Sequence, residues 1–220
     1  NVGGVLANPR LEVYTGNNPN PVLTNDDWAT KAGGAAQVTA IQQATQRAGA
    51  FILANNSLDA VVMATLPPGQ YTVQAKGPAN NPNASGVVLI EVYDVTPNLA
   101  TAGRAVNVAT RGSVGTGTNI LIAGFVVNGT VARRVLIRGV GPTLANLGVP
   151  GVLVDPQLTL VDQATGRTLA TNDNWASGED AAIIAAAARS AGAFPLANGS
   201  RDAAILVMLP PGAYTAQLSG

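Results

Sequence analysis

The sequence contains no cysteine and no histidine, and each absence removes a group of functions. Without cysteine there is no disulfide bond, no thiolate nucleophile and no thiolate metal ligand. Without histidine, the Ser-His-Asp and Cys-His catalytic arrangements and imidazole metal sites are excluded as well. Only three glutamates are present, and no acidic pair recurs in a pattern typical of glycosidases. We therefore expect neither an enzyme nor a cofactor.

Charge is also scarce, at 11% of the residues against about 25% in ordinary soluble domains. The 12 basic and 12 acidic residues cancel, so we expect no basic face for nucleic acid. No apolar run approaches the ~20 residues of a membrane-spanning helix. A surface with so little charge repels copies of itself weakly, which favours self-assembly. A neutral monomer with an Asn/Thr/Gly-rich surface is the alternative.

The chain matches itself, which is its most informative feature. Residues 2–11 (VGGVLANPRL) match residues 149–158 (VPGVLVDPQL), and TNDDWA at 24–29 matches TNDNWA at 171–176. Further on, AGAF, LPPG and YT recur in the same order, and Gly77 aligns with Gly220. Residues 78–146 occur once, so the first copy has no counterpart of the segments around Ile120 and Val135. The second copy has no counterpart of residues 86–94. We expect two incomplete modules, 1–100 and 101–220.

Short apolar or alternating segments rich in β-branched residues predict β-strands. They are residues 71–75, 87–95, 120–127, 134–140, 157–161, 204–209 and 214–218. Asn128-Gly129 between two of these segments predicts a hairpin. The two Pro-Pro-Gly sequences, at 67–69 and 210–212, predict tight turns between strands in which glycine supplies a positive φ.

Each copy also contains one helical segment. Residues 34–48 have an apolar stripe, and residues 179–191 are rich in Ala and Ile with acidic residues at their start. Trp28 and Trp175 precede these segments, and we expect each to pack beneath its helix. The chain is thus predicted to be mainly β, with β-sandwich or barrel-like modules, each with one short α-helix, internally duplicated.

A longer series of motifs resembles a known repeat unit. The series contains VNVATRG at 106–112, LIAGFV at 121–126, VLIRGVGPTL at 135–144, NDNW at 172–175, GAF at 192–194, PPGAYT at 210–215 and GVVLIEVYD at 86–94. Together these segments resemble a tandem repeat unit of large secreted proteins of environmental bacteria. The resemblance implies export, an extracellular or cell-surface location and a structural role. It implies no catalytic residues. The chain departs from the pattern by starting and ending inside a unit.

The oxygen-rich loops before the helices are the best polar motifs. Asp26, Asp27 and Asp173 are calcium candidates, because hard cations prefer carboxylate and carbonyl oxygens. The alternative is that these Asn and Asp side chains cap the following helix or close a turn. Asp59 and Asp202 recur too, each at a turn that is expected to start a strand. The glycine-rich segments 115–117 and 139–142 lack the Lys-Ser/Thr of phosphate-binding loops, so we expect no small-molecule substrate.

The unpaired strands of the two modules suggest how copies could join. A sheet without one of its strands exposes N–H and C=O groups that a neighbouring copy can pair with. We expect a structural subunit of an extracellular filament or surface assembly, a homopolymer built by head-to-tail β-strand complementation. The expected interface residues are Val2, Val5, Leu6, Leu11, Val87, Leu89, Glu91 and Tyr93. The alternative is a secreted adhesion or carbohydrate-binding β module that acts as a monomer.

Overall fold

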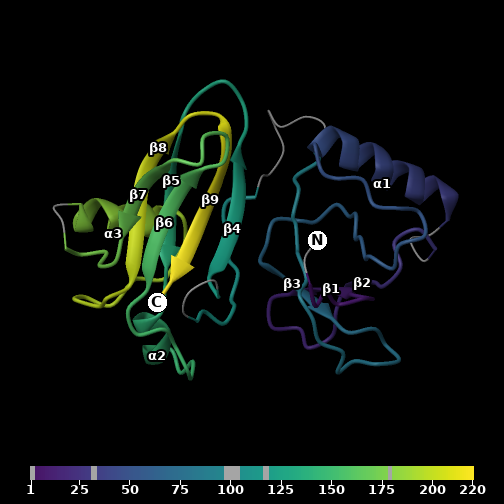
Figure 1. Ribbon diagram of the computed structural model, residues 1–220, viewed down its shortest axis with the longest axis horizontal. Helices are drawn as coiled ribbons and strands as arrows, with labels where there is room; N and C mark the ends of the chain where they lie inside the picture. Colours follow the sequence, from purple (N-terminus) through teal and green to yellow (C-terminus); the bar gives the residue numbers. More distant parts are fainter. Residues whose placement is uncertain (1–2, 31–33, 97–104, 116–118, 178–179) are drawn as a thin grey trace. The chain divides into compact units, whose positions relative to one another are not determined.

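A computed structural model describes residues 3–30, 34–96, 105–115, 119–177 and 180–220. The described chain is mainly β, with three antiparallel sheets and three short helices (Figure 1). It forms two compact units, Asn1–Ala105 (unit 1) and Val106–Gly220 (unit 2). The expected boundary at residue 100 lies outside the described residues.

Unit 1 contains one three-stranded sheet and one helix. Its elements are β1 (Arg10–Thr15), β2 (Leu23–Asn25), α1 (Ala35–Ala48) and β3 (Tyr71–Lys76). The strand order is β2-β1-β3, so β1 is central and β3 forms one edge. Helix α1 ends where Gly49 adopts a left-handed conformation with φ of 68°, a geometry that favours glycine.

Unit 2 contains two sheets and two helices. Its elements are β4 (Leu121–Val127), β5 (Arg133–Gly139), α2 (Pro142–Asn146), β6 (Gln157–Asp162), β7 (Thr168–Asn172), α3 (Ala181–Ser190), β8 (Ala203–Leu209) and β9 (Gly212–Ser219). One sheet has the order β4-β9-β6-β7, and the other is the pair β5-β8. Helix α2 was not expected, and it gives this unit a second helix. It begins at Pro142, whose fixed φ suits the first helical turn.

The two sheets of unit 2 share a core, as in a β-sandwich. Leu158, Leu160 and Tyr214 from the larger sheet pack with Ile205 and Leu209 from the smaller one. Successive residues of a strand point to opposite faces. Accordingly, the side chains of β8 that face away from this core pack with Trp175 and Ile184 of α3. The β5-β8 pair is therefore covered on both faces.

Unit 1 has a counterpart of the cluster that packs between the sheet and helix α3 in unit 2. Trp28 and Ile41 of α1 are buried together, with Val38, Leu53 and Val61 packed against them. The expectation that each tryptophan packs beneath its helix is confirmed in both units. The described part of unit 1 has only one sheet, and the residues that correspond to the core between the two sheets of unit 2 are less buried. Val13 is buried, whereas Leu11 and Tyr71 are only half-buried.

Three strands of the structure, β1, β2 and β7, were missed in the sequence, and one predicted strand is wrong. Residues 87–95 do not form a strand. Their single ladder contact is a parallel bridge between Val87 and Val5. These residues have the composition of a strand, but a strand also requires a partner edge, and none pairs with them among the described residues.

The predicted hairpin at Asn128-Gly129 is also wrong. Strand β4 pairs with β9 and β5 pairs with β8, so the turn connects the two sheets instead of two paired strands. Gly129 has a positive φ of 107°, whereas Asn128, like every described non-glycine residue, does not have a positive φ. A type I′ hairpin turn needs a positive φ at both central residues, so Asn128 does not form one.

Of the two Pro-Pro-Gly sequences, the second joins two strands as expected, whereas the first does not. The second connects β8 to β9 across the two sheets, and no strand directly precedes Pro67 in the described part of unit 1. Neither Gly69 nor Gly212 has a positive φ. Instead, the hydroxyl of Tyr214 donates to the carbonyl oxygen of Pro210 at 2.8 Å, and a Cβ on Gly212 would lie 3.2 Å from that hydroxyl. Glycine therefore leaves room for a tyrosine corner.

Candidate assembly surface

The two units share their repeated segments but differ in what pairs with them. In unit 2, β9 carries β6 on one side and β4 on the other. In unit 1, β3 matches β9 in sequence and carries β1 on one side, while its other edge has no strand among the described residues. An edge of this kind presents unpaired N–H and C=O groups.

The segment that precedes β3 also lacks a pairing partner that its counterpart in unit 2 has. Residues 202–209 (DAAILVML) contain β8, which pairs with β5 along its whole length. Residues 59–66 (DAVVMATL) match them, yet they form no strand. Leu209 is 1% exposed, whereas Leu66 at the equivalent position is 45% exposed. The described part of unit 1 has no counterpart of β5 to pair with this segment and cover it.

A buried carboxylate fixes this region in unit 2. Asp202 is fully buried, and its Oδ1 accepts hydrogen bonds from the backbone N–H groups of Gly141 (2.8 Å) and Thr143 (3.2 Å). Its Oδ2 accepts from the hydroxyls of Thr143 and Ser200. Asp202 thus joins the start of α2 to the start of β8. The sequence placed it only at a turn.

Unit 1 retains one half of this arrangement. The backbone N–H of Trp28 donates to the carbonyl oxygen of Asp59 at 2.9 Å, as that of Trp175 does to Asp202 at 2.7 Å. However, the hydroxyl of Ser57, which corresponds to Ser200, is buried and has no hydrogen-bond partner among the described residues. A buried polar group without a partner is costly.

A third difference concerns the paired phenylalanines, Phe51 and Phe194. In unit 2, the guanidinium of Arg138 lies 4.5 Å from the ring centroid of Phe194 and donates to its backbone oxygen at 2.6 Å. Burial lowers the pKa of Arg138, and Asp202 opposes this effect. Phe51 in unit 1 is 59% exposed. Phe194 is 41% exposed, so neither phenylalanine lies in a core.

Six of the eight expected interface residues fall into two groups. Val5, Leu6 and Val87 are brought together: the N–H of Leu6 donates to the oxygen of Val87 at 3.0 Å, and the N–H of Val87 donates to that of Gly4 at 2.8 Å. Leu89, Glu91 and Tyr93 are exposed, and the Tyr93 hydroxyl donates to Glu91 at 2.9 Å. Leu11 is half-buried in β1. Val2 lies outside the described residues.

The asparagines of the repeated loops hold the chain in place. The side-chain oxygen of Asn172 accepts from the N–H of Ala204 at 2.9 Å, and that of Asn25 accepts from Val61 at 3.0 Å. Neither α1 nor α3 has a side-chain cap, so the alternative in which these Asn and Asp side chains cap the following helix is wrong. Within the described ranges, no three acidic residues come together as a metal site, around Asp26, Asp27, Asp173 or elsewhere.

Unit 1 also has a charged cluster that the sequence did not predict. The buried carboxylate of Glu12 contacts Lys76 Nζ at 2.6 Å and Arg10 at 2.5 Å, and it accepts from the Tyr14 hydroxyl. The hydrogen bonds from Lys76 and Tyr14, together with Arg10, hold the pKa of Glu12 below its ordinary value. The contact with Glu12 raises the pKa of Lys76. This cluster ties β1 to β3.

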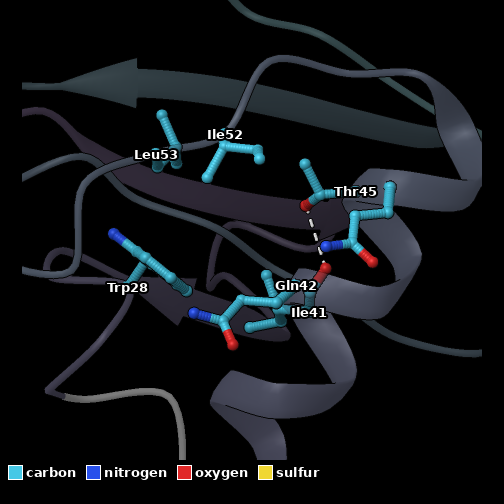
Figure 2. Close-up of a pocket in the computed structure, with 7 residues that line it drawn as sticks. Trp28, Ile41, Gln42, Thr45, Ile52 and Leu53 are labelled. Atoms are coloured by element: carbon cyan, nitrogen blue, oxygen red, sulfur yellow. Dashed lines mark hydrogen bonds between the residues drawn. The ribbon is translucent and has the colours of Figure 1, made fainter.

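A small pocket lies beside α1. Figure 2 shows Trp28, Ile41, Ile52 and Leu53 around it, with Gln42 and Thr45 on the helix side. The Thr45 hydroxyl donates a hydrogen bond to the backbone oxygen of Ile41 at 2.9 Å, within the same helix. The pocket volume is about 220 Å³, which is below the roughly 300–1,000 Å³ of typical small-molecule sites. The open edge of unit 1 is the stronger candidate site.

None of the helices in the described ranges is long and apolar enough to cross a membrane. Comparison with family models, curated proteins and solved structures finds no match to this chain.

Proposed function

We propose that this chain is a structural subunit of an extracellular filament or surface assembly, in which copies join head to tail by β-strand complementation. The observation that carries the proposal is the difference between the two units. Matching segments are paired in unit 2 and unpaired in the described part of unit 1, where β3 keeps an open edge and residues 59–66 have no partner strand.

Exposed apolar side chains support the same function. Val87, Leu89 and Val92 are 56%, 70% and 62% exposed. Together with Leu66 and Phe51, they leave unit 1 with apolar surface that a neighbouring copy can cover. The formal net charge of zero adds no repulsion between copies. The resemblance to repeat units of secreted proteins is the basis for the extracellular location.

The test is size-exclusion chromatography and electron microscopy of the 220-residue chain near neutral pH. We expect regular polymers. Leu89→Lys places a charge in the exposed apolar segment of unit 1 and is expected to abolish them. Ile183→Lys is the matched control, because Ile183 is 50% exposed on α3, and it is expected to leave them intact.

A monomer of 22.1 kDa at every concentration would overturn the proposal. A non-catalytic adhesion or carbohydrate-binding module would then become the leading function. A glycan array would test it, with Phe51 as the exposed aromatic side chain to replace first.

A further inference from the structure

Strands β3 and β9 share the sequence that leads into them but differ at one edge. Leu-Pro-Pro-Gly stands at or just before the start of each strand, and both have a tyrosine whose hydroxyl donates to the first proline's oxygen at 2.8 Å. β9 pairs with β4 along seven residues, from Leu121 opposite Leu218 to Val127 opposite Gly212. The same edge of β3 has no strand among the described residues. The strand on β9 therefore shows what this edge accepts.

Residues 89–95 (LIEVYDV), which we call the donor segment, match β4 (LIAGFVV). Leu and Ile come first in both, an aromatic residue stands fifth, and Val stands last. The fifth residue of β4, Phe125, stacks on Tyr214 of β9 with ring centroids 5.6 Å apart. Tyr93 holds that position in the donor segment.

The donor segment is available for pairing. It forms no strand, and its first six side chains are exposed. Tyr93 is 43% exposed, and its hydroxyl donates a hydrogen bond to the nearby Glu91. Glu91 takes the position of Ala123, which is exposed in unit 2, so its charge would stay in water.

The register of β4 on β9 transfers directly to β3. It places Tyr93 opposite Tyr71, Leu89 opposite Ala75 and Val92 opposite Thr72. Tyr71 and Ala75 are half-buried and face the same side of β3, whereas Thr72 faces the other side. The new aromatic pair would reproduce the stack between Phe125 and Tyr214.

We propose that the donor segment of one copy adds to the open edge of β3 in a second copy, antiparallel and in this register. The inference rests on the proposed function and specifies its interface. Within one chain, Val87 is hydrogen-bonded to Gly4 and Leu6, just before the donor segment. A Cβ on Gly86 would lie 2.5 Å from the nitrogen of Leu6, so this anchor is close-packed. The donor segment continues from this anchor and reaches β3 of the next copy.

Disulfide cross-linking tests the register, because the chain has no cysteine of its own. Thr72→Cys and Val92→Cys are prepared as separate proteins, mixed, allowed to assemble and oxidised. Residues directly opposite in an antiparallel pair have Cα atoms about 4.5–5.5 Å apart, within reach of a disulfide. We expect a disulfide-linked dimer that contains one chain of each kind. Each variant alone controls for random contacts.

The matched control is Thr72→Cys mixed with Tyr93→Cys, whose side chains would lie on opposite faces of the sheet. We expect at least about tenfold less dimer from this pair, since the two faces cannot be bridged without moving the backbone. Polymers that give no more dimer with Val92→Cys than with Tyr93→Cys would overturn the register and leave the proposed function standing. An absence of both polymers and dimers would overturn both. A chain that carries both Thr72→Cys and Val92→Cys and forms its disulfide within a monomer would overturn the exchange between copies.

Discussion

The leucines of the two Leu-Pro-Pro-Gly sequences allow a direct test of how the units differ. Leu209 is 1% exposed in the core between the sheets of unit 2, and Leu66 is 45% exposed. Leu→Ala in a close-packed core costs about 2–5 kcal/mol, from the lost burial and from the cavity left behind. We therefore expect Leu209→Ala to destabilise unit 2 by about 3 kcal/mol. For Leu66→Ala we expect about 1 kcal/mol in unit 1, because roughly half of a leucine's ~2 kcal/mol of burial is at stake and no cavity forms.

Each unit has its own fluorescent reporter, since the only two tryptophans are Trp28 and Trp175. Trp175→Phe leaves the reporter of unit 1, and Trp28→Phe leaves that of unit 2. Urea unfolding would be followed by tryptophan fluorescence at concentrations where the chain is monomeric. With a slope of about 1.5 kcal/mol per molar urea, Leu209→Ala lowers the midpoint of unit 2 by about 2 M. Leu66→Ala lowers that of unit 1 by less than about 1 M.

Equal losses of unfolding free energy in Leu209→Ala and Leu66→Ala would refute the reasoning, because Leu66 would then lie in a closed core. The comparison also extends to the assembled state. If a neighbouring copy covers the open region of unit 1, Leu66→Ala should lower the free energy of unfolding more in polymers than in monomers. The effect of Leu209→Ala should be the same in both states.

Three further predictions concern individual side chains. Asp202→Ala leaves buried N–H groups without an acceptor and should cost about 3 kcal/mol by urea unfolding, whereas the matched change Asp59→Ala should cost less than about 1 kcal/mol. The pKa of Glu12 is lowered in the folded state, so its contribution to stability is present above the unfolded pKa of about 4.3 and is lost as the pH falls through the folded value. On acidification, the free energy of unfolding of unit 1 should therefore fall more steeply in the wild type than in Glu12→Gln. Urea unfolding followed by Trp28 fluorescence at a series of pH values measures this. Parallel curves of stability against pH would contradict it. Gly141→Ala would place a Cβ 2.0 Å from a backbone oxygen and should lower the thermal midpoint of unit 2 by more than about 10 °C, whereas Gly124→Ala, whose Cβ would be 4.0 Å from its nearest neighbour, should lower it far less.

Local sequence predicted most of the strands of unit 2, because their β-branched and apolar runs are bounded by Gly and Pro. It could not predict which strands pair. The connection at Asn128-Gly129 has the composition of a hairpin, yet β4 and β5 belong to different sheets. Strand pairing depends on which apolar faces meet across the core, and this is a property of the whole unit. β1, β2 and β7 were missed because they are short or contain polar and charged residues.

The candidate site was harder to predict, because its determinants are contacts between distant segments. The role of Asp202 depends on the N–H groups of Gly141 and Thr143, which lie about 60 residues earlier in the chain. The one available signal was the recurrence of an Asp two residues after Ser in both copies. The Glu12 cluster depends on Lys76, which the register of β1 on β3 brings opposite Arg10.

Residues 59–66 and 202–209 make the strongest argument for assembly. Both segments begin with Asp-Ala, continue with apolar residues and lead into Leu-Pro-Pro-Gly. One contains a strand and the other does not, although both are largely apolar. β5 pairs with the second segment, whereas no described strand pairs with the first. An apolar segment of this kind forms a strand in unit 2, where its partner β5 is present. In the proposed assembly, a neighbouring copy would supply the partner strand that this segment of unit 1 lacks among the described residues.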